Sequence, residues 1–225
     1  GHMNLGAGRI VVQDLPLIDK AIQEKSLARN PALTKLITDL KKKNGACHLL
    51  GLVSPGGVHS HQNHLIALAK ILNTKNIPVK LHAFMDGRDT APSGGKEFLK
   101  DVIEHTSKLR NFSVATITGR YWAMDRDNNW DRIERAYVAI VDGEGVKAKD
   151  PINAIETSYD QGKTDEFMLP NVLSGYRGMD NGDAILMFNF RSDRARQIIS
   201  CFVDPEFYEF KKKRNINLTA QVTMT

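Results

Sequence analysis

Arginine side chains recur in short motifs along this chain, and arginine is the residue type best suited to hold an anion. A guanidinium group can donate two parallel hydrogen bonds to one carboxylate or phosphate, a geometry that lysine does not offer. Each charged hydrogen bond of this kind contributes about 1.5 to 3 kcal/mol when it is shielded from water. The motifs are GAGR at 6–9, SPGGVHSH at 54–61, DGRDT at 86–90, GRYWAMDRD at 119–127 and FNFRSDRAR at 188–196.

The DGRDT motif places a cation, Arg88, beside a carboxylate, Asp89. A carboxylate held among arginines stays ionised, and it can accept a hydrogen bond from a substrate hydroxyl or relay its proton. The alternative is a turn with a structural ion pair, because Asp and Gly are common turn residues. The other arginine motifs lead us to favour a functional role.

Two further motifs supply arginine pairs. Arg120 and Arg126 flank an aromatic pair, and Arg191 and Arg194 flank Asp193. A helix is expected to begin near Ser192, where its free N–H groups would also favour an anion. Arginine is unfavourable at the start of a helix, so a ligand is the expected reason for its presence there.

Arginine next to aromatic residues is also found where proteins bind single-stranded nucleic acid. In this chain aromatic residues make up only 7% of the sequence, and Asp125, Asp127 and Asp131 lie among the arginines. Those carboxylates would repel a polyphosphate backbone. We therefore favour a compact anionic metabolite and expect no nucleic-acid partner, with RNA binding through the basic runs at 41–43 and 211–214 as a lower-ranked alternative.

Three histidines, His59, His61 and His64, lie close together in the sequence. They suggest a metal site, but no second cluster of His, Asp or Cys at ligand spacing accompanies them. Contact with an anion or a hydroxyl is the favoured role, and a metal site is the less favoured one.

The elements that must position these motifs alternate between strands and helices. Short apolar runs bounded by turn residues are typical of strands covered on both faces, and helical patterns lie between them. The alternation predicts an α/β fold, a parallel-rich mixed sheet with helices packed outside, in which ligands bind beyond the carboxyl ends of the strands. The predicted strands are 46–53, 79–85, 112–118, 184–190 and 215–225, and the predicted helices are 16–25, 31–42, 64–72, 98–109 and 130–141.

Composition sets broader limits. The 225 residues, 41% of them hydrophobic, suffice for a full core, and we favour a single domain. No apolar run approaches the roughly 18 residues of a membrane span, and no signal peptide opens the chain. Cys47 and Cys201 stand in apolar stretches and are expected to be buried. A cytoplasmic protein without a membrane partner is therefore expected.

The runs GLVSPGGVHSH, DGRDT, GRYWAMDRDNNWDR and FNFRSDRAR, in this order, resemble the substrate-binding domain of the cofactor-independent phosphoglycerate mutases. The similarity covers essentially the whole chain. It implies that Asp89 is the catalytic acid/base and that no residue of this chain binds metal. The substrate contacts that it implies are His59, Arg88, Asp89, Arg120, Arg126, Arg191 and Arg194.

The resemblance also implies a reaction and a second domain. These enzymes interconvert 3-phosphoglycerate and 2-phosphoglycerate through a phosphoserine, without bisphosphoglycerate. The serine and two divalent metals, manganese or magnesium, belong to a phosphatase-like domain that is absent here. Residues 1–225 are then expected to be one domain excised from a two-domain enzyme, with 1–13 and 215–225 near the interdomain hinges and with no mutase activity of its own.

A stand-alone binding or regulatory protein for phosphorylated metabolites would share these sequence features. Both functions remain open on the sequence alone.

Overall fold

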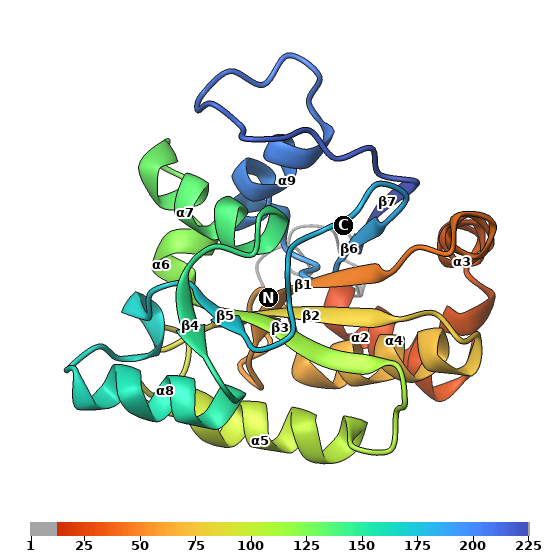
Figure 1. Cartoon of the computed structure of the whole chain (residues 1–225). Helices are drawn as coiled ribbons and strands as arrows, with labels where there is room; N and C mark the ends of the chain where they lie inside the picture. The colour runs from red at the N-terminus through yellow and green to blue at the C-terminus, as the bar shows by residue number, and fades with distance from the viewer. Residues whose placement is uncertain (1–12, 225) are drawn as a thin grey trace, which may run out of the picture.

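The computed structural model describes residues 13–224, which form one mixed, mostly parallel sheet between two layers of helices (Figure 1). The strand order is β4-β5-β3-β2-β1-β6-β7. Neighbouring strands are parallel throughout, except that β5 runs antiparallel to β3. This architecture confirms the predicted fold class. The strands are β1 (Cys47–Val53), β2 (Val79–Met85), β3 (Phe112–Gly119), β4 (Val146–Ala148), β5 (Asn171–Leu173), β6 (Ala184–Met187) and β7 (Ala220–Thr223).

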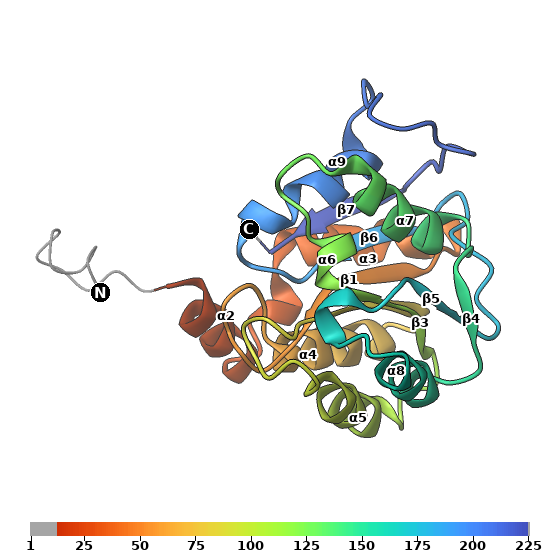
Figure 2. The ribbon, with the colours of Figure 1, turned by 90° about the vertical axis from the view of Figure 1, so that its left-hand side faces the viewer.

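Each face of the sheet has its own hydrophobic core. Figures 1 and 2 show α3, α4, α5 and α8 over one face and α6, α7 and α9 over the other. Within residues 13–224, no helix has both the length and the hydrophobicity that crossing a membrane requires. The helices are α2 (Asp14–Gln23), α3 (Pro31–Lys43), α4 (Gln62–Thr74), α5 (Gly95–Thr106), α6 (Arg120–Ala123), α7 (Trp130–Val141), α8 (Pro151–Asp160) and α9 (Arg196–Val203), with short 3₁₀ turns η1 (Leu27–Arg29), η2 (Asp165–Phe167) and η3 (Ser192–Arg194).

Helix α3 shows how local sequence sets these boundaries. The Asn30 side chain accepts hydrogen bonds from the backbone N–H groups of Ala32 and Leu33, at 2.9 and 3.3 Å. Pro31 then occupies the first helical position, where its missing N–H costs nothing. A side-chain cap of this kind stabilises a helix by about 1 kcal/mol. The helix ends at Lys43, and the next residue, Asn44, adopts a left-handed conformation with φ of 52°.

Four predicted elements have boundaries that differ from the structure by three residues or more. Strand β6 ends at Met187 rather than at residue 190, because the Phe190 N–H bonds to the His59 carbonyl in the neighbouring loop. The helix expected near Ser192 is only the 3₁₀ turn η3, and α9 begins at Arg196, so the inference of helical N–H groups at this loop was wrong. The final strand is limited to β7, and the helix predicted at 98–109 is α5, displaced by three residues.

Two strands were not predicted at all. They are β4, at Val146–Ala148, and β5, at Asn171–Leu173. Each strand has three residues, too few to show alternation of apolar and polar side chains. Tertiary pairing with β3 holds β5 in place.

A line of buried polar side chains crosses the face of the sheet under α7. Asp183 Oδ2 lies 3.0 Å from His48 Nε2, His48 Nδ1 lies 2.8 Å from His82 Nε2, and His82 Nδ1 lies 2.9 Å from Thr116 Oγ1. Burial, followed by the neighbouring His48, holds the pKa of His82 well below its usual value. Every group in the line has a partner, so the line ties β1, β2 and β3 together.

Both cysteines are buried and free, as predicted. Burial raises the pKa of Cys201 to about 12 and raises that of Cys47 as well. Neither thiol is therefore ionised near neutral pH, and both act as small apolar side chains.

Candidate functional site

The loops that carry the candidate residues leave the same edge of the sheet. Strands β1, β2, β3 and β6 are mutually parallel neighbours, so the loops that follow them meet at the carboxyl end. Figure 2 shows α2 and the end of β7 on that same side of the molecule. The candidate residues on these loops are His59 after β1, Arg88 and Asp89 after β2, Arg120 and Arg126 after β3, and Arg191 and Arg194 after β6.

Arg120 lies at the base of the site and joins two of its loops. Its side chain is only 3% exposed, and Nη1 donates to Asp86 Oδ1 at 2.7 Å and to Asp89 Oδ2 at 2.6 Å. Burial disfavours the charged guanidinium, but the hydrogen bonds to Asp89 and Asp86 outweigh it and raise the pKa of Arg120. The cation is thus fixed and permanently charged.

Asp86 anchors the DGRDT loop from beneath. It accepts hydrogen bonds from Ser54 Oγ at 2.7 Å and from the backbone N–H groups of Arg88 and Asp89 at 3.2 and 3.0 Å. Burial opposes its ionisation, but the bonds from the Asp89 N–H, Ser54 and Arg120 outweigh burial and lower the pKa of Asp86. Asp86 therefore stays charged and sets the position of the Asp89 backbone.

His59 lies between two carboxylates. Nε2 is 3.6 Å from Asp89 Oδ2, and Nδ1 is 3.6 Å from Asp193 Oδ1. The ring is 3% exposed, and burial, followed by repulsion from Arg120, lowers the pKa of His59 to about 4. Near neutral pH the imidazole is therefore uncharged, and it can donate one hydrogen bond and accept another.

Asp193 connects two of the outer arginines. Arg126 Nη1 lies 3.0 Å from Asp193 Oδ2, and Arg191 Nε lies 3.0 Å from Asp193 Oδ1. Both arginine side chains are about half exposed, at 46% and 51%. With Arg120, Asp86 and Asp89 these residues form a line of charged groups across the site, in which the uncharged His59 lies between Asp89 and Asp193.

Arg88 and Arg194 flank this line. Arg194 Nη1 donates to the Met124 carbonyl at 3.2 Å. Burial, followed by repulsion from Arg126 and the other nearby arginines, lowers the pKa of Arg194. Arg88 is more than half exposed, with Nη1 3.7 Å from Glu166 Oε1. The surplus of positive charge at these positions suits an anion.

Sequence reasoning missed three residues that support the site, namely Ser54, Asp86 and Glu166. The 3₁₀ turn η2 passes so close to two loops that they require glycine: a Cβ on Gly87 would lie 2.9 Å from the Glu166 N, and one on Gly119 would lie 2.3 Å from the Glu166 carbonyl oxygen. Asp86 was visible within its motif as the first residue after a strand. No sequence pattern indicated Glu166, because this residue is far from the arginine motifs along the chain.

The other two histidines of the cluster have structural contacts. The His61 side chain caps α4 by accepting from the Asn63 N–H, and His64 Nε2 lies 2.8 Å from Asp19 Oδ1 of α2. Across residues 13–224, no group of three or more His, Cys, Asp or Glu side chains is arranged to hold a metal ion. The GAGR motif at 6–9 lies outside the described residues.

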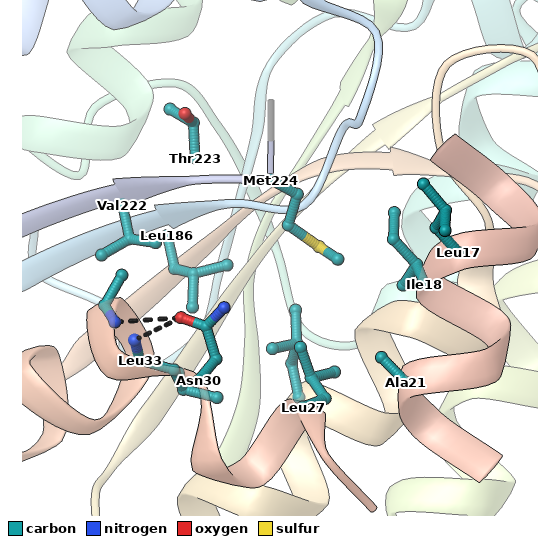
Figure 3. A pocket seen from close by; sticks show the side chains of 12 residues that line it. Leu17, Ile18, Ala21, Leu27, Asn30, Leu33, Leu186, Val222, Thr223 and Met224 are labelled. Carbon is teal, nitrogen blue, oxygen red and sulfur yellow. Dashed lines mark hydrogen bonds between the residues drawn. The ribbon is translucent and has the colours of Figure 1, made fainter. Parts of the chain in front are cut away.

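An apolar pocket of about 320 Å³, which no arginine lines, is shown in Figure 3. Leu17, Ile18 and Ala21 of α2 line one side, and Met224 lies between them and Leu186, as Figure 3 shows. None of the candidate site residues lines it. Its apolar wall does not suit a charged ligand, so the chemistry belongs to the arginine loops.

The geometry fits a small molecule with two anionic groups. Five arginines approach from three loops, while Asp89 and the uncharged His59 supply a proton acceptor and a neutral hydrogen-bonding group among them. Two separated anionic groups could each engage a pair of guanidinium groups, and a hydroxyl between them could meet Asp89.

Comparison with known proteins agrees with this geometry. The chain is 47% identical to the 2,3-bisphosphoglycerate-independent phosphoglycerate mutase of Gluconobacter oxydans over all 225 residues, which span 44% of that relative. It is 49% identical over 219 residues to the enzyme of the same name from Clostridium perfringens, covering 95% of this chain and 43% of the relative. A crystal structure of Leishmania mexicana phosphoglycerate mutase matches with a TM-score of 0.87 and 28% identity, over 96% of this chain and 42% of that one.

A family model matches most of the chain directly. The model, described as the N-terminus of BPG-independent PGAM, covers residues 18–225. The chain spans less than half the length of the curated relatives that it matches. On this evidence, the chain belongs to the family of N-terminal domains of the 2,3-bisphosphoglycerate-independent phosphoglycerate mutases.

Proposed function

We propose that this chain binds phosphoglycerate and, within a full-length mutase, positions it for interconversion of 3-phosphoglycerate and 2-phosphoglycerate. The observation that carries the proposal is the gathering of five arginines on three neighbouring loops at the carboxyl edge of the sheet, where Arg120 holds the carboxylate of Asp89. Phosphoglycerate has a carboxylate, a phosphate and a free hydroxyl, which are the three groups this arrangement can contact. The relatives named as mutases support the same ligand.

The arginines divide into a fixed and a mobile set. Arg120 is buried and held by two carboxylates, so it provides a constant positive potential at the base of the site. Arg88, Arg126 and Arg191 are about half exposed and can follow a ligand as it turns. Holding the glycerate through such a rotation keeps its effective concentration high and prevents its loss to water.

Asp89 is the proposed acid/base. Its Oδ2 is held by Arg120, and its side chain is 22% exposed, so a ligand hydroxyl can approach it. In the proposed reaction phosphate first leaves the substrate for the serine, and the proton lost by the serine hydroxyl reaches the leaving C2 or C3 oxygen through Asp89. As phosphate returns to the substrate, Asp89 accepts the proton of the other hydroxyl and passes it back to the serine oxygen, so the number of protons balances.

The rest of the reaction is assigned to another part of the polypeptide. We propose that the phosphate passes to a serine of a phosphatase-like domain that holds two divalent metals, manganese or magnesium, and that no bisphosphoglycerate is needed. Ser54 does not suit the role of nucleophile, because it is only 1% exposed and its hydroxyl is held beneath the DGRDT loop by Asp86. Residues 1–13 and 215–225 are proposed to lie near the hinges to that domain. A place in glycolysis and gluconeogenesis is the basis for expecting a cytoplasmic location.

The proposal predicts weak binding of 3-phosphoglycerate by this chain alone. Since the other domain's contacts are missing, we expect a dissociation constant in the millimolar range. This corresponds to a binding free energy of about −4 kcal/mol. Arg126→Ala should weaken binding about tenfold or more, because it removes a charged hydrogen bond to the ligand. Isothermal titration calorimetry measures both values.

Arg110→Ala is the matched control. Arg110 is an exposed arginine just before β3, at the opposite edge of the sheet, so its removal should leave the affinity unchanged. Equal affinities for wild type, Arg126→Ala and Arg110→Ala, or no binding by the wild-type chain, would contradict the proposed function.

A further inference from the structure

One carboxylate of the site has no part in the proposed chemistry. Asp193 lies within η3, its side chain is 30% exposed, and it contacts residues from three loops. Its two oxygens lie 3.0 Å from Arg126 Nη1 and 3.0 Å from Arg191 Nε. The oxygen that meets Arg191 is also 3.6 Å from His59 Nδ1. Asp193 therefore lies where an anionic group of a ligand would meet the same three side chains.

Asp193 differs from the other carboxylates of the site in the arginines with which it pairs. Asp86 and Asp89 both pair with Arg120, and Glu166 forms an ion pair with Arg88. Among residues 13–224, Asp193 is the carboxylate that forms ion pairs with Arg126 and Arg191. Burial opposes ionisation of Asp193, but attraction from Arg191 and the other cations outweighs it, so the pKa of Asp193 is lowered and the group is charged.

We propose that Asp193 is an internal counter-anion: its carboxylate occupies Arg126 and Arg191 in the free protein, and a carboxylate or phosphate of the ligand must displace it. This inference rests on the proposed function for the identity of the ligand. Asp193 then acts as a residue that sets affinity, since every anion that uses these two arginines competes with it. When a ligand leaves, Asp193 pairs with both arginines again, which favours release.

The structure permits the exchange. Asp193 belongs to a three-residue turn with no side-chain cap, and both of its arginine partners are about half exposed. Its carboxylate can therefore turn toward solvent without disturbing a buried pair. Replacing one carboxylate by another at the same two arginines gains little, so a ligand with a second anionic group, held by arginines such as Arg88 and Arg194, should bind more tightly than one with a single anionic group.

Asp193→Asn tests the inference because it keeps the shape of the side chain and removes the charge. Removing a like charge a few ångströms from a bound anion should tighten binding about tenfold. Calorimetric titrations with 3-phosphoglycerate and with inorganic phosphate, at one fixed low salt concentration, measure the change. Asp193→Glu, which keeps the charge, and Asp160→Asn, which removes an exposed charge from the end of α8, should both stay close to wild type.

The outcomes separate the inference from the proposed function. Tighter binding of both anions by Asp193→Asn supports the counter-anion, and tighter binding of phosphate alone supports it even if 3-phosphoglycerate does not bind. Measurable wild-type binding with equal or weaker binding by Asp193→Asn would overturn the inference and leave the proposed function intact. No binding of either anion by either protein would contradict both.

Discussion

Asp89→Asn is expected to lower the turnover of the full-length mutase by about 10² to 10⁴, the range of a lost general acid/base. The asparagine has nearly the same shape, and its amide oxygen can still accept the hydrogen bond from Arg120. It cannot take a proton from a substrate hydroxyl and return it. The fold and the Michaelis constant should therefore change little, while steady-state conversion of 3-phosphoglycerate to 2-phosphoglycerate, measured in a coupled assay, falls.

Asp160→Asn serves as the control for this change, since it removes the same charge from an exposed position on α8. Circular dichroism of each variant checks that the fold is retained. A turnover of Asp89→Asn within about threefold of wild type would show that Asp89 does not transfer the proton.

Arg120→Ala should destabilise the chain by about 3 to 5 kcal/mol, as expected when one partner of a buried ion pair is removed. Asp86 is only 1% exposed, and the variant would leave its charge without the guanidinium. Ligand binding should be lost as well, because Arg120 also positions Asp89. Urea unfolding followed by circular dichroism gives the loss of stability.

Arg126→Ala provides the comparison within the same site. Its ion pair with Asp193 is about half exposed, and such pairs contribute about 1 kcal/mol or less. If Arg120→Ala costs no more stability than Arg126→Ala, the buried pair does not have the structural role assigned to it here.

The sequence predicted the parts of the fold that local physics determines. Strand β2 and helix α7 have the predicted bounds, because apolar runs and helical periodicity both depend on nearby residues. Strand β6 and turn η3 were predicted less well. Their ends are set by contacts with other loops, such as the bond from the Phe190 N–H to the His59 carbonyl.

The candidate site, like the fold, could be predicted only in part from the sequence. Parallel strands bring their carboxyl ends to one edge, so the gathering of Arg88, Arg120 and Arg191 could be expected from motif positions alone. The ion pairs of Arg120 with both Asp86 and Asp89 could not be predicted, because the pairing of side chains depends on the separation of neighbouring loops. Glu166 reaches Arg88 through η2, a turn whose position no pattern in the sequence indicates.

The central claim is that the arginines at the carboxyl edge bind phosphoglycerate. The most direct test is a chemical-shift titration of the arginine side-chain Nε–Hε groups of this chain with 3-phosphoglycerate. We expect saturable shifts at Arg120, Arg126 and Arg191. All three should give the same dissociation constant, in the millimolar range, which corresponds to a binding free energy of about −4 kcal/mol. Arg110 and Arg177, which lie near the amino ends of the strands, should not shift. Shifts of similar size at all arginines, or none at the first three, would contradict the claim.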